Sequence, residues 1–284
     1  MVFTMALISS LKRLIKIWVI TLGGVLCCLS TLGQEWELLD SHTLELPVRM
    51  VSADRFNNIY INDSKGNIRK LDSVGHPIAL FAPQQFGKLT NLESWSSLRL
   101  FLFYEDTQRY TFLDRYLAAS EFSEFPAGRF GYLRLAAPSS DNQIWLLDLR
   151  PLNLIKFDMT FSEITLNQSL NQLSDTLDLN PYQLIEYQNR VYLGDSKIGV
   201  LVFDNLGNYL RTLTKTESSQ FHLWEEQLYY LSNNHLHFLS IYSDQEQSIK
   251  LPDRGQSYQH VLMLSNTTVL ISDNQIFFFR YHSR

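Results

Sequence analysis

Cysteine is almost absent from the chain: two are present in 284 residues, and they are adjacent, at Cys27 and Cys28. Both fall within residues 1–33, so the rest of the chain has no thiol. A disulfide framework, a cysteine nucleophile and a cysteine-ligated metal are therefore excluded for residues 34–284.

Positive charge is also scarce. The chain has 24 Lys and Arg against 29 Asp and Glu, a formal net charge of −5. Positions 1–33 hold Lys12, Arg13 and Lys16 and no acidic residue, so the remainder carries −5 − 3 = −8. A surface of this sign disfavours nucleic acid and anionic lipid headgroups as partners.

Long apolar runs are missing except for one near the N-terminus. Residues 17–29 form an apolar run of about 13 residues, whereas a membrane span needs about 20. The run follows three basic residues and precedes Thr31-Leu32-Gly33, with small residues at the positions that a signal peptidase requires. We expect residues 1–33 to be a signal peptide cleaved before Gln34, with no membrane span left. Lipidation at Cys27 or Cys28 and an uncleaved anchor remain alternatives.

Export of a cysteine-free β protein suits the bacterial envelope better than a eukaryotic secretory route. The expected location is therefore the periplasm, the cell surface or the medium of a Gram-negative bacterium.

One sequence unit recurs six times along the chain. Its most regular part is a short apolar run, followed by Asp in the first four copies, at residues 68–72, 110–114, 154–158, 200–204, 236–240 and 276–280. The fourth positions of these runs are Leu71, Leu113, Phe157, Phe203, Leu239 and Phe279. They recur with a period of roughly 42 on average, and a period of about 40 to 45 that contains only strand signals is typical of a β-propeller blade.

Each copy contains an earlier apolar run that ends in a polar turn, at residues 59–63, 100–106, 144–148, 191–195, 228–233 and 269–273. The runs are rich in β-branched and aromatic residues and too short for helices. They are nearly continuous in apolar residues, as expected for a sheet covered on both faces. In four copies one Asp follows another by eight to ten residues, and Asp side chains close turns by accepting backbone N–H groups two residues on.

The repeat predicts an all-β, six-bladed propeller that spans residues 34–284 as one domain. The expected blades are residues 47–81, 89–122, 131–166, 181–213, 221–251 and 258–284, joined by connections 82–88, 123–130, 167–180, 214–220 and 252–257. The longest connection has room for a helical turn around Leu170, Leu173 and Leu177. Residues 34–46 read as a single strand, and the last copy stops after three strands. We therefore expect the N-terminal strand to complete the C-terminal blade and close the ring.

Two motifs resemble those of a known group. They are N-x-ϕ-Y-ϕ-x-D, at residues 57–63 and in part at 189–195, and ϕ-x-x-ϕ-D-x-x-G, at 68–75 and 200–207, where ϕ is apolar. The chain is similar in these motifs to the six-bladed propellers of the NHL and TolB-like group, found among exported proteins of Gram-negative bacteria. The resemblance implies a binding scaffold or, more distantly, a lactonase or amidating lyase with a metal on the channel axis. No metal-binding set of those enzymes matches this chain, so no catalytic residue is assigned.

Candidate ligand-binding residues precede the apolar runs, where inner strands line a propeller channel: Arg49, Glu93, Arg134, Glu186, His222 and His260. Either they converge on one ligand, or they are the polar lining that any wet channel has. A second group lies in the connections, with Arg129 and Phe130 its main members and Phe86, Phe125, Tyr132, Tyr182, Tyr258 and Gln84 nearby. Arg and aromatic residues anchor interfaces, but aromatics there also cap cores.

Two further patterns favour a structural interpretation. His235 and His237 share one strand face, as a metal pair would, but no third ligand is near in sequence. Residues 63–67, DSKGN, resemble part of a calcium loop without its terminal Glu, and a β-turn explains them better. We therefore predict neither a metal nor a cofactor.

Three functions follow from these observations. The first is a non-catalytic, exported propeller, monomeric outside any assembly, that presents its inter-blade loops to a protein, peptide or glycan of the envelope. The second is a metal-dependent lactonase or lyase acting in the channel. The third is a structural subunit of an outer-membrane assembly. Fold alone does not choose among them.

Overall fold

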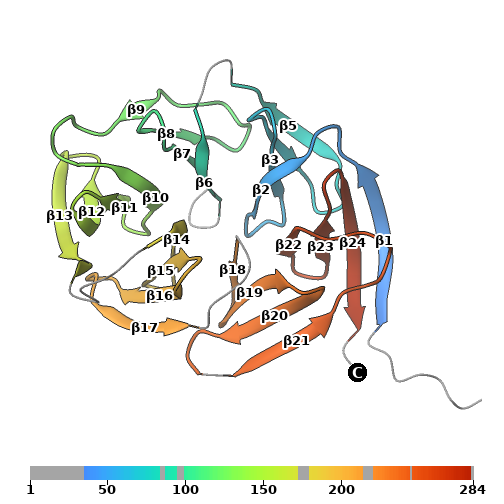
Figure 1. Cartoon of the computed structure of the whole chain (residues 1–284). Helices are drawn as coiled ribbons and strands as arrows, with labels where there is room; N and C mark the ends of the chain where they lie inside the picture. The colour runs from blue at the N-terminus through green and yellow to red at the C-terminus, as the bar shows by residue number, and fades with distance from the viewer. Residues whose placement is uncertain are drawn as a thin grey trace, which may run out of the picture. The chain divides into compact units, whose positions relative to one another are not determined.

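The computed structural model describes residues 35–83, 87–94, 99–171, 179–213, 220–243 and 245–282. These residues form six four-stranded sheets, and the sheets follow one another around a central axis (Figure 1). Residues 36–281 make up one compact unit. The predicted six-bladed propeller is therefore confirmed. The predicted signal peptide and Cys27 and Cys28 lie outside the described residues.

Blades one to three are built from consecutive strands. Blade one contains β2 (Val48–Ala53), β3 (Ile59–Asp63), β4 (Ile68–Leu71) and β5 (Pro77–Phe81). Blade two contains β6 (Leu89–Glu93), β7 (Leu100–Tyr104), β8 (Arg109–Leu113) and β9 (Ser123–Glu124). Blade three contains β10 (Leu133–Pro138), β11 (Gln143–Leu149), β12 (Leu152–Asp158) and β13 (Glu163–Ser169).

Blades four and five follow the same order, and blade six borrows a strand. Blade four contains β14 (Pro181–Tyr187), β15 (Arg190–Asp195), β16 (Gly199–Asp204) and β17 (Tyr209–Leu213). Blade five contains β18 (His222–Trp224), β19 (Gln227–Ser232), β20 (His235–Ser240) and β21 (Glu246–Lys250). Blade six contains β22 (His260–Met263), β23 (Thr268–Ile271), β24 (Gln275–His282) and, outermost, β1 (Glu35–Thr43).

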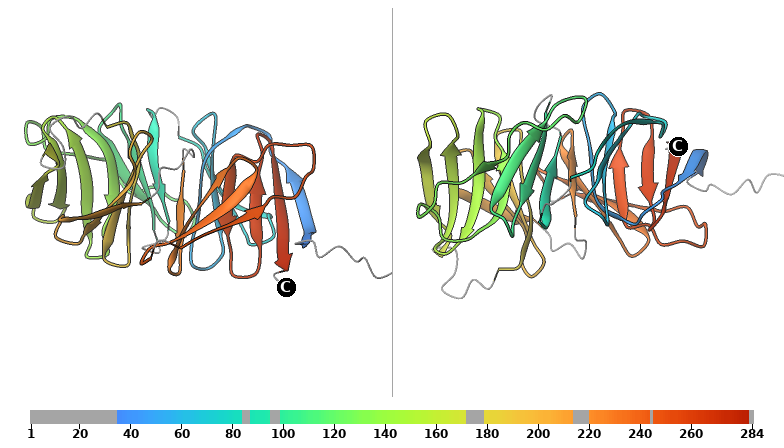
Figure 2. Two further views of the ribbon diagram at one scale, coloured as in Figure 1. Left: turned by 60° about the horizontal axis from the view of Figure 1, so that its bottom comes forward. Right: turned by 90° about the horizontal axis from the view of Figure 1, so that it is seen from above.

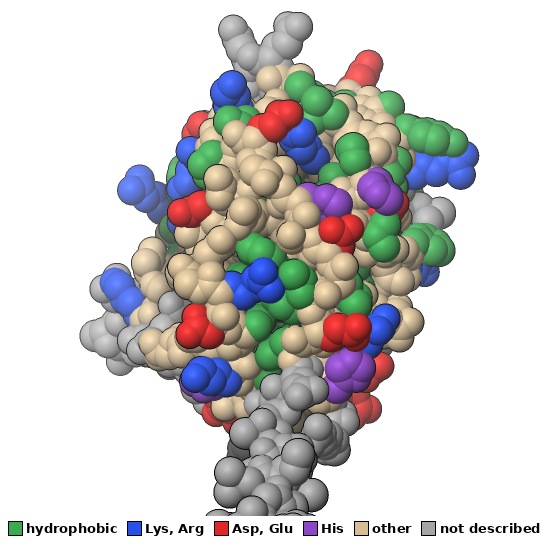
Figure 3. Space-filling model, turned by 90° about the vertical axis from the view of Figure 1, so that its right-hand side faces the viewer, with side chains coloured by type: hydrophobic (Ala, Val, Ile, Leu, Met, Phe, Trp, Pro, Cys, Tyr) green, Lys and Arg blue, Asp and Glu red, His purple; other side chains and the backbone are tan. Residues whose placement is uncertain are grey.

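The pairing of β1 with β24 confirms the predicted closure of the ring by the N-terminal strand (Figure 1). Side chains reinforce the pairing. Trp36 lies against Phe279 and Tyr281, with ring centroids 5.9 and 4.9 Å apart. Its indole Nε1 donates a hydrogen bond of 2.8 Å to the carbonyl of Lys250 in blade five. Figure 3 views the rim on this side, where apolar side chains are interspersed with charged ones.

Strand periodicity explains why the second strand of each blade is nearly continuous in apolar residues. Successive side chains of a strand point to opposite faces of its sheet. In β15, Val191 and Leu193 pack in a cluster shared with blade three, whereas Tyr192 packs in a cluster shared with blade five. Six such clusters fill the six interfaces between neighbouring blades. The hydrophobic core is thus divided among the interfaces, with the channel left at the axis.

Aspartates close the turns as the sequence predicts. Five turns share one geometry, in which the carboxylate accepts backbone N–H groups from the residues two and four positions later, at 2.8–3.0 Å; they begin at Asp54, Asp63, Asp72, Asp114 and Asp204. The fourth residue of each turn has a positive φ, and it is Gly in three of them. Residues 63–67 are one of these turns, so the interpretation as a β-turn is confirmed.

The antiparallel strand order gives the ring two different faces. The connection face carries the connections between blades and the turns between second and third strands. The opposite face carries the turns between first and second and between third and fourth strands. Figure 2 shows the strands running between the two faces.

Two predicted boundaries are wrong. The sequence places Ser123 and Glu124 in a connection, but they form the short outer strand β9, and residues 167–169 belong to β13. Outer strands are exposed on one face and polar, so they lack the apolar signal that marks the inner three. The expected helical turn falls largely on residues 172–178, outside the described ranges, although Leu170 is buried in the interface with blade four. No helical segment in the described part of the chain has the length and apolar character needed to cross a membrane.

Candidate functional site

A bulge recurs near the start of the first four inner strands. The pairing register shifts between Val48 and Met50, and at the equivalent places in β6, β10 and β14, so that one residue is left over in each strand. Those extra residues are Arg49, Thr90, Arg134 and Tyr182. A bulge re-aims the side chain that it carries. Two of the six predicted channel residues, Arg49 and Arg134, therefore lie at the connection face.

Arg134 is part of a polar cluster between blades two and three. Its guanidinium donates to Glu105 and, at 3.3 Å, to the carbonyl of Pro181. The Glu105 carboxylate also accepts hydrogen bonds from Tyr132 at 2.7 Å and Lys88 at 3.2 Å. Burial alone would raise the pKa of Glu105, but the hydrogen bonds from Arg134 and Tyr132 outweigh it and hold the pKa below its usual value. Arg134 thus joins three blades.

Arg49 is exposed and lies in a pocket between blades one and two. This pocket, called the connection-face pocket here, has a volume of about 430 Å³ and is lined by Arg49, Asn62, Asp63, Ser64, Lys65, Gly66, Pro83, Gly87, Lys88, Leu89, Tyr104 and Asp106. Lys88 is paired with Glu105. No hydrogen bond or ion pair of the Arg49 or Lys65 side chain exists within the described ranges.

The two carboxylates that line this pocket, Asp63 and Asp106, accept hydrogen bonds from the protein itself. Asp63 is buried and binds its own turn, through the N–H groups of Lys65 and Asn67 and the side-chain amide of Asn67. Asp106 accepts the backbone N–H of Lys88 at 2.7 Å. Equivalent aspartates fix the chain entering blades three and four: Asp148 accepts the N–H of Gly131, and Asp195 that of Asn180. Asp63 therefore fixes the blade-one side of the pocket, and Asp106 fixes the blade-two side.

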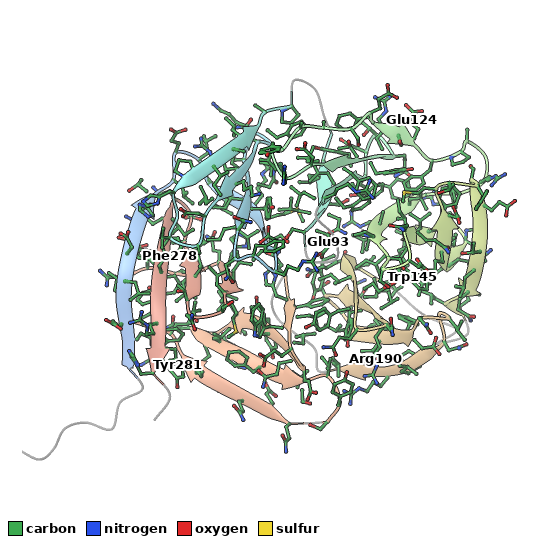
Figure 4. The ribbon with its side chains drawn as sticks, turned by 180° about the vertical axis from the view of Figure 1, so that it is seen from behind. Glu93, Glu124, Trp145, Arg190, Phe278 and Tyr281 are labelled. Carbon is green, nitrogen blue, oxygen red and sulfur yellow. The ribbon has the colours of Figure 1, made fainter. Side chains whose placement is uncertain are left out.

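Glu93 and His222 line a cavity in the channel toward the opposite face (Figure 4 shows Glu93 near the axis). The cavity measures about 40 Å³, room for a water molecule or two. His222 stacks on Tyr229 with ring centroids 5.3 Å apart. Burial, with a smaller contribution from neighbouring His260, lowers the pKa of His222 to about 3.

His260 is buried between blades five, six and one. It donates from Nδ1 to the side-chain carbonyl of Gln220 at 3.0 Å, and the amide of Gln220 donates to the carbonyl of Val51 at 2.9 Å. Burial lowers the pKa of His260. His260 therefore fixes Gln220, at the end of the connection that enters blade five, against blades six and one.

Glu186 points away from the channel toward blade three. It is one residue beyond Ile185, which lines the channel cavity, and a shift of one residue in a strand turns the side chain to the other face. Its carboxylate accepts hydrogen bonds from Ser139, Ser140 and Trp145 at 2.5–2.9 Å. The six predicted residues thus do not share one site: Glu93 and His222 line one cavity with His260 near them, and the other three are dispersed.

Phe130 belongs to the core. It packs edge-on against Phe125 and Phe157, with centroids 5.8 and 5.5 Å apart, in the cluster between blades two and three. Of the two interpretations of this residue, the structure supports core capping. Arg129 is exposed and donates to the carbonyl of Ser162, in the turn between the third and fourth strands of blade three. Phe86 and Gln84 lie outside the described residues.

The remaining sequence patterns have local roles. His235 donates from Nδ1 to the carbonyl of Asn233 at 2.9 Å, and His237 stacks on Tyr230 and lies 3.3 Å from Glu246. Among the described residues, no group of three or more His, Cys, Asp or Glu side chains is placed to hold a metal ion. Lys65 and Lys88 line the connection-face pocket but are not among the residues predicted from the sequence. Their positions in the sequence could have indicated them, because Lys65 lies in the turn of residues 63–67 and Lys88 ends the connection between blades one and two.

The fold is shared with several solved structures. It is similar to virginiamycin B lyase from Staphylococcus aureus, an inactive variant bound to quinupristin, with a TM-score of 0.59 and 9% identity over 87% of this chain and 99% of that chain. It is similar to the WD40 domain of Neurospora crassa Pan2, with a TM-score of 0.56 and 9% identity over 89% and 97%.

PorZ, a surface component of the type-IX secretion system of Porphyromonas gingivalis, matches with a TM-score of 0.51 and 14% identity over 78% of this chain and 29% of that chain. No protein-family model and no curated protein sequence matches the chain. Identities this low establish the fold alone. The resemblance to NHL and TolB-like propellers is confirmed at the level of the six-bladed fold, and the narrower assignment stays a prediction.

Proposed function

We propose that the protein is a non-catalytic binding propeller whose connection-face pocket takes an anionic group of a protein, peptide or glycan. The observation that carries this proposal is that two cationic side chains, Arg49 and Lys65, line one pocket. The carboxylates of that pocket already accept hydrogen bonds from the protein backbone. The proposal retains the predicted face of the ring but moves the site from Arg129 and Phe130 to the boundary of blades one and two.

The charge of the pocket favours an anion. Its lining holds three cations, Arg49, Lys65 and Lys88, and two carboxylates, Asp63 and Asp106, which leaves a net charge of +1. Both carboxylates accept backbone N–H groups, and Lys88 is paired with Glu105. Arg49 and Lys65 are therefore the cations left for a ligand. An Arg binds carboxylate, sulfate or phosphate through charge-assisted hydrogen bonds, about twice as strong as neutral ones.

Size also favours this pocket over the channel. Small-molecule sites usually have volumes of about 300–1,000 Å³, and the connection-face pocket, at about 430 Å³, falls in this range. The channel cavity is about 40 Å³, too small for an organic substrate. Glu186, an acid of the inner strands, is committed to hydrogen bonds with blade three.

We further propose that the protein acts outside the cytoplasm, in the cell envelope. Support for this comes from the basic residues, short apolar run and small residues of positions 12–33, and from the lack of cysteine in the remainder.

A charge-reversal experiment tests the site. Calorimetric titration with citrate, inorganic phosphate and a uronic-acid oligosaccharide is compared for the wild type and Arg49→Glu/Lys65→Glu. We expect at least one probe to bind, and its affinity to fall by at least about tenfold in the variant, since about 1.4 kcal/mol corresponds to a factor of ten. Binding of none of the probes would contradict the proposal.

The chain offers a matched control. Lys197 follows Asp195 and Ser196 as Lys65 follows Asp63 and Ser64, and each lysine donates its backbone N–H to its aspartate, at 2.8 and 2.9 Å. Lys197→Glu makes the same change of charge as Lys65→Glu alone, on the same face of the ring but in blade four. Affinity should stay within about twofold there, because exposed charges beyond a Debye length are screened. An equal loss in the control would mean that net charge, not the pocket, governs binding.

A further inference from the structure

Two turns on the opposite face each present an arginine followed by an aromatic side chain. Asp54-Arg55-Phe56 follows the inner strand of blade one, and Asp114-Arg115-Tyr116 follows the third strand of blade two. Both positions are turns of the opposite face. The aromatic rings are exposed, Phe56 to 61% and Tyr116 to 66%. They are thus among the most exposed large apolar side chains of the described residues.

The two turns have the same backbone. In each, the Asp carboxylate accepts the N–H of the aromatic residue, at 2.9 Å for Phe56 and 2.8 Å for Tyr116, and the N–H two residues further on. The fourth residue has a φ of 64° at Asn57 and 62° at Leu117. These bonds fix the turn without using the Arg or aromatic side chain. The exposed pairs are therefore additions to the turn rather than parts of its frame.

In both turns the arginine lies over the ring that follows it. The guanidinium carbon of Arg55 is 5.3 Å from the ring centroid of Phe56, and that of Arg115 is 4.7 Å from the centroid of Tyr116. A cation held within about 6 Å of a ring face is attracted by it. The pairs therefore form preorganised surfaces, part cationic and part apolar. Arg and aromatic residues are the types that most often dominate interface energetics.

A groove joins the two turns. It has a volume of about 250 Å³ and is lined by Asp54, Phe56, Asn58, Tyr60, Lys70, Ser94, Arg99 and Arg115. The ammonium of Lys70 donates to the backbone carbonyl of Arg115 at 2.9 Å and so ties the blade-two turn to blade one. Phe56 and Arg115 share this groove although they belong to different blades.

The groove is cationic in an acidic protein. Its lining holds three cations, Lys70, Arg99 and Arg115, and one carboxylate, Asp54. The oxygens of Asp54 accept four hydrogen bonds, from Phe56 N, Asn58 N, the Asn58 amide and the Tyr60 hydroxyl. Arg55 adds a fourth cation at the edge. The whole chain has a net charge of −5, so positive charge is concentrated here against the general trend.

We propose that the groove and the two Arg–aromatic turns bind an extended acidic segment of a partner protein, with its carboxylates on the arginines and an apolar side chain against Phe56 or Tyr116. This site is on the face opposite the connection-face pocket and is independent of the function proposed for that pocket.

Charge distribution favours an acidic peptide over a nucleic acid. A nucleic acid is a long polyanion with one charge for about every 1.7 Å of duplex axis, and it would run from the groove onto the acidic surface of the remaining blades. A short acidic segment covers only the cationic groove. Arginine also matches carboxylates through two parallel hydrogen bonds, and peptides supply apolar side chains for the exposed rings.

The test uses a short labelled synthetic peptide of alternating Glu and Tyr and measures its binding by fluorescence anisotropy. We expect Arg55→Glu/Arg115→Glu to weaken binding at least tenfold and Phe56→Ala/Tyr116→Ala to weaken it at least threefold. Arg55→Gln/Arg115→Gln, which keeps the length and polarity of the side chains, should weaken it to an intermediate degree. Circular dichroism and urea unfolding establish that each variant is folded.

A third turn of the same geometry supplies the control. In the turn Asp204-Asn205-Leu206 of blade four, the Asp204 carboxylate accepts the N–H groups of Leu206 and Asn208, and Leu206 is 63% exposed. Asn205→Glu/Leu206→Ala places a Glu and an Ala at the equivalent positions of this turn, away from the groove, and should leave binding within twofold of the wild type. The proposal is overturned if the wild type does not bind the peptide or if the control loses as much affinity.

Two other outcomes would also overturn it. Tighter binding of a single-stranded oligonucleotide than of the peptide would identify a nucleic-acid surface. Loss of peptide binding in Arg49→Glu/Lys65→Glu, with retention in Arg55→Glu/Arg115→Glu, would place the acidic segment in the connection-face pocket. Failure of the citrate, phosphate and oligosaccharide probes at that pocket, by contrast, leaves the groove unaffected.

Discussion

The indole Nε1 of Trp145, in the second strand of blade three, donates a hydrogen bond of 2.5 Å to the carboxylate of Glu186 on the inner strand of blade four. Two serines of blade three, Ser139 and Ser140, donate to the same carboxylate. A charged group that accepts several hydrogen bonds across an interface orients both sides of it. Glu186 therefore positions one blade against the next rather than acting on a ligand.

Replacement of Glu186 should destabilise the propeller strongly. Glu186→Ala removes the acceptor of four hydrogen bonds and leaves the donors of the buried Ser139 and Trp145 unsatisfied, with an expected loss of about 3 kcal/mol in the free energy of unfolding. Glu186→Gln keeps an acceptor and should lose less. Urea unfolding measures both. Glu163→Ala, on the exposed outer strand of blade three, should change stability by less than about 0.5 kcal/mol.

Stability should fall as pH is lowered below about 6.5, because of the channel histidines. Burial lowers the pKa of His222 from 6.5 to about 3, so between these values the unfolded chain binds a proton that the folded chain does not. The free energy of unfolding therefore has its full value above pH 6.5. As pH falls below 6.5, it decreases by up to about 1.4 kcal/mol per pH unit for each such histidine. The lowered pKa of His260 acts in the same direction.

His222→Gln should reduce the slope of unfolding free energy against pH between 6.5 and 5, measured by urea unfolding at several pH values. The carboxylates with lowered pKa values, Glu105 and Glu186, lose their contribution only at more acid pH. His235→Gln is the comparison, since its ring lies at the periphery of blade five. If both variants keep the wild-type slope, His222 is not buried as described.

Ring closure should depend on Trp36. Its indole packs on Phe279 and Tyr281 and donates to the carbonyl of Lys250, so that β1 contacts blades six and five. Trp36→Ala should lower the free energy of unfolding by about 3 kcal/mol. Leu39→Ala, at an exposed position of the same strand, should cost little. A thermal-unfolding midpoint for Trp36→Ala close to that of Leu39→Ala would contradict the closure described here.

An alanine variant is usually more stable than a glycine variant at the same position, and Leu117 should be an exception. Its φ of 62° is strained for a residue with a Cβ, by roughly 1–2 kcal/mol, yet its side chain is buried between blades one and two. Both Leu117→Ala and Leu117→Gly lose that burial, but only glycine relieves the strain. Leu117→Gly should therefore be at least as stable as Leu117→Ala in urea unfolding. At Leu113, in the strand before it, glycine should be the worse replacement.

The sequence alone predicts much of this fold, because the fold is repetitive. Runs such as residues 191–195 recur with one period, and turn aspartates such as Asp63 and Asp204 recur with them. Closure by β1 follows from counting strands, since the final copy lacks its fourth. The exposed outer strands are harder to locate. Ser123 and Glu124 form only a two-residue strand, and no apolar pattern marks it.

The candidate site is much harder to predict, for a geometric reason. Arg49 and Arg134 occupy bulges, which shift the alternation of the inner strand by one residue. The strands of Glu93 and Glu186 carry the same bulge, but Glu186 stands one residue further along its strand than the equivalent of Glu93, and so it lies on the opposite face. Positions that look alike in sequence therefore point in different directions. Lys65 reaches the pocket from a turn in another part of the blade, and only the folded ring brings it near Arg49.

The Arg–aromatic turns are visible in the sequence but carry no signal by themselves. Asp54-Arg55-Phe56 and Asp114-Arg115-Tyr116 belong to different blades and occupy different turns of those blades. That they border one groove follows from the packing of blade one against blade two, through contacts such as Lys70 with the carbonyl of Arg115.

An NMR titration with citrate shows whether the connection-face pocket holds an anion. We predict that the backbone amide resonances of Gly66 and Gly87, both in the pocket lining, shift saturably, that Gly199 in blade four does not, and that the shifts vanish in Arg49→Glu/Lys65→Glu. Shifts spread evenly over the blades, or shifts at Gly66 that persist in the variant, would contradict the proposed anion site.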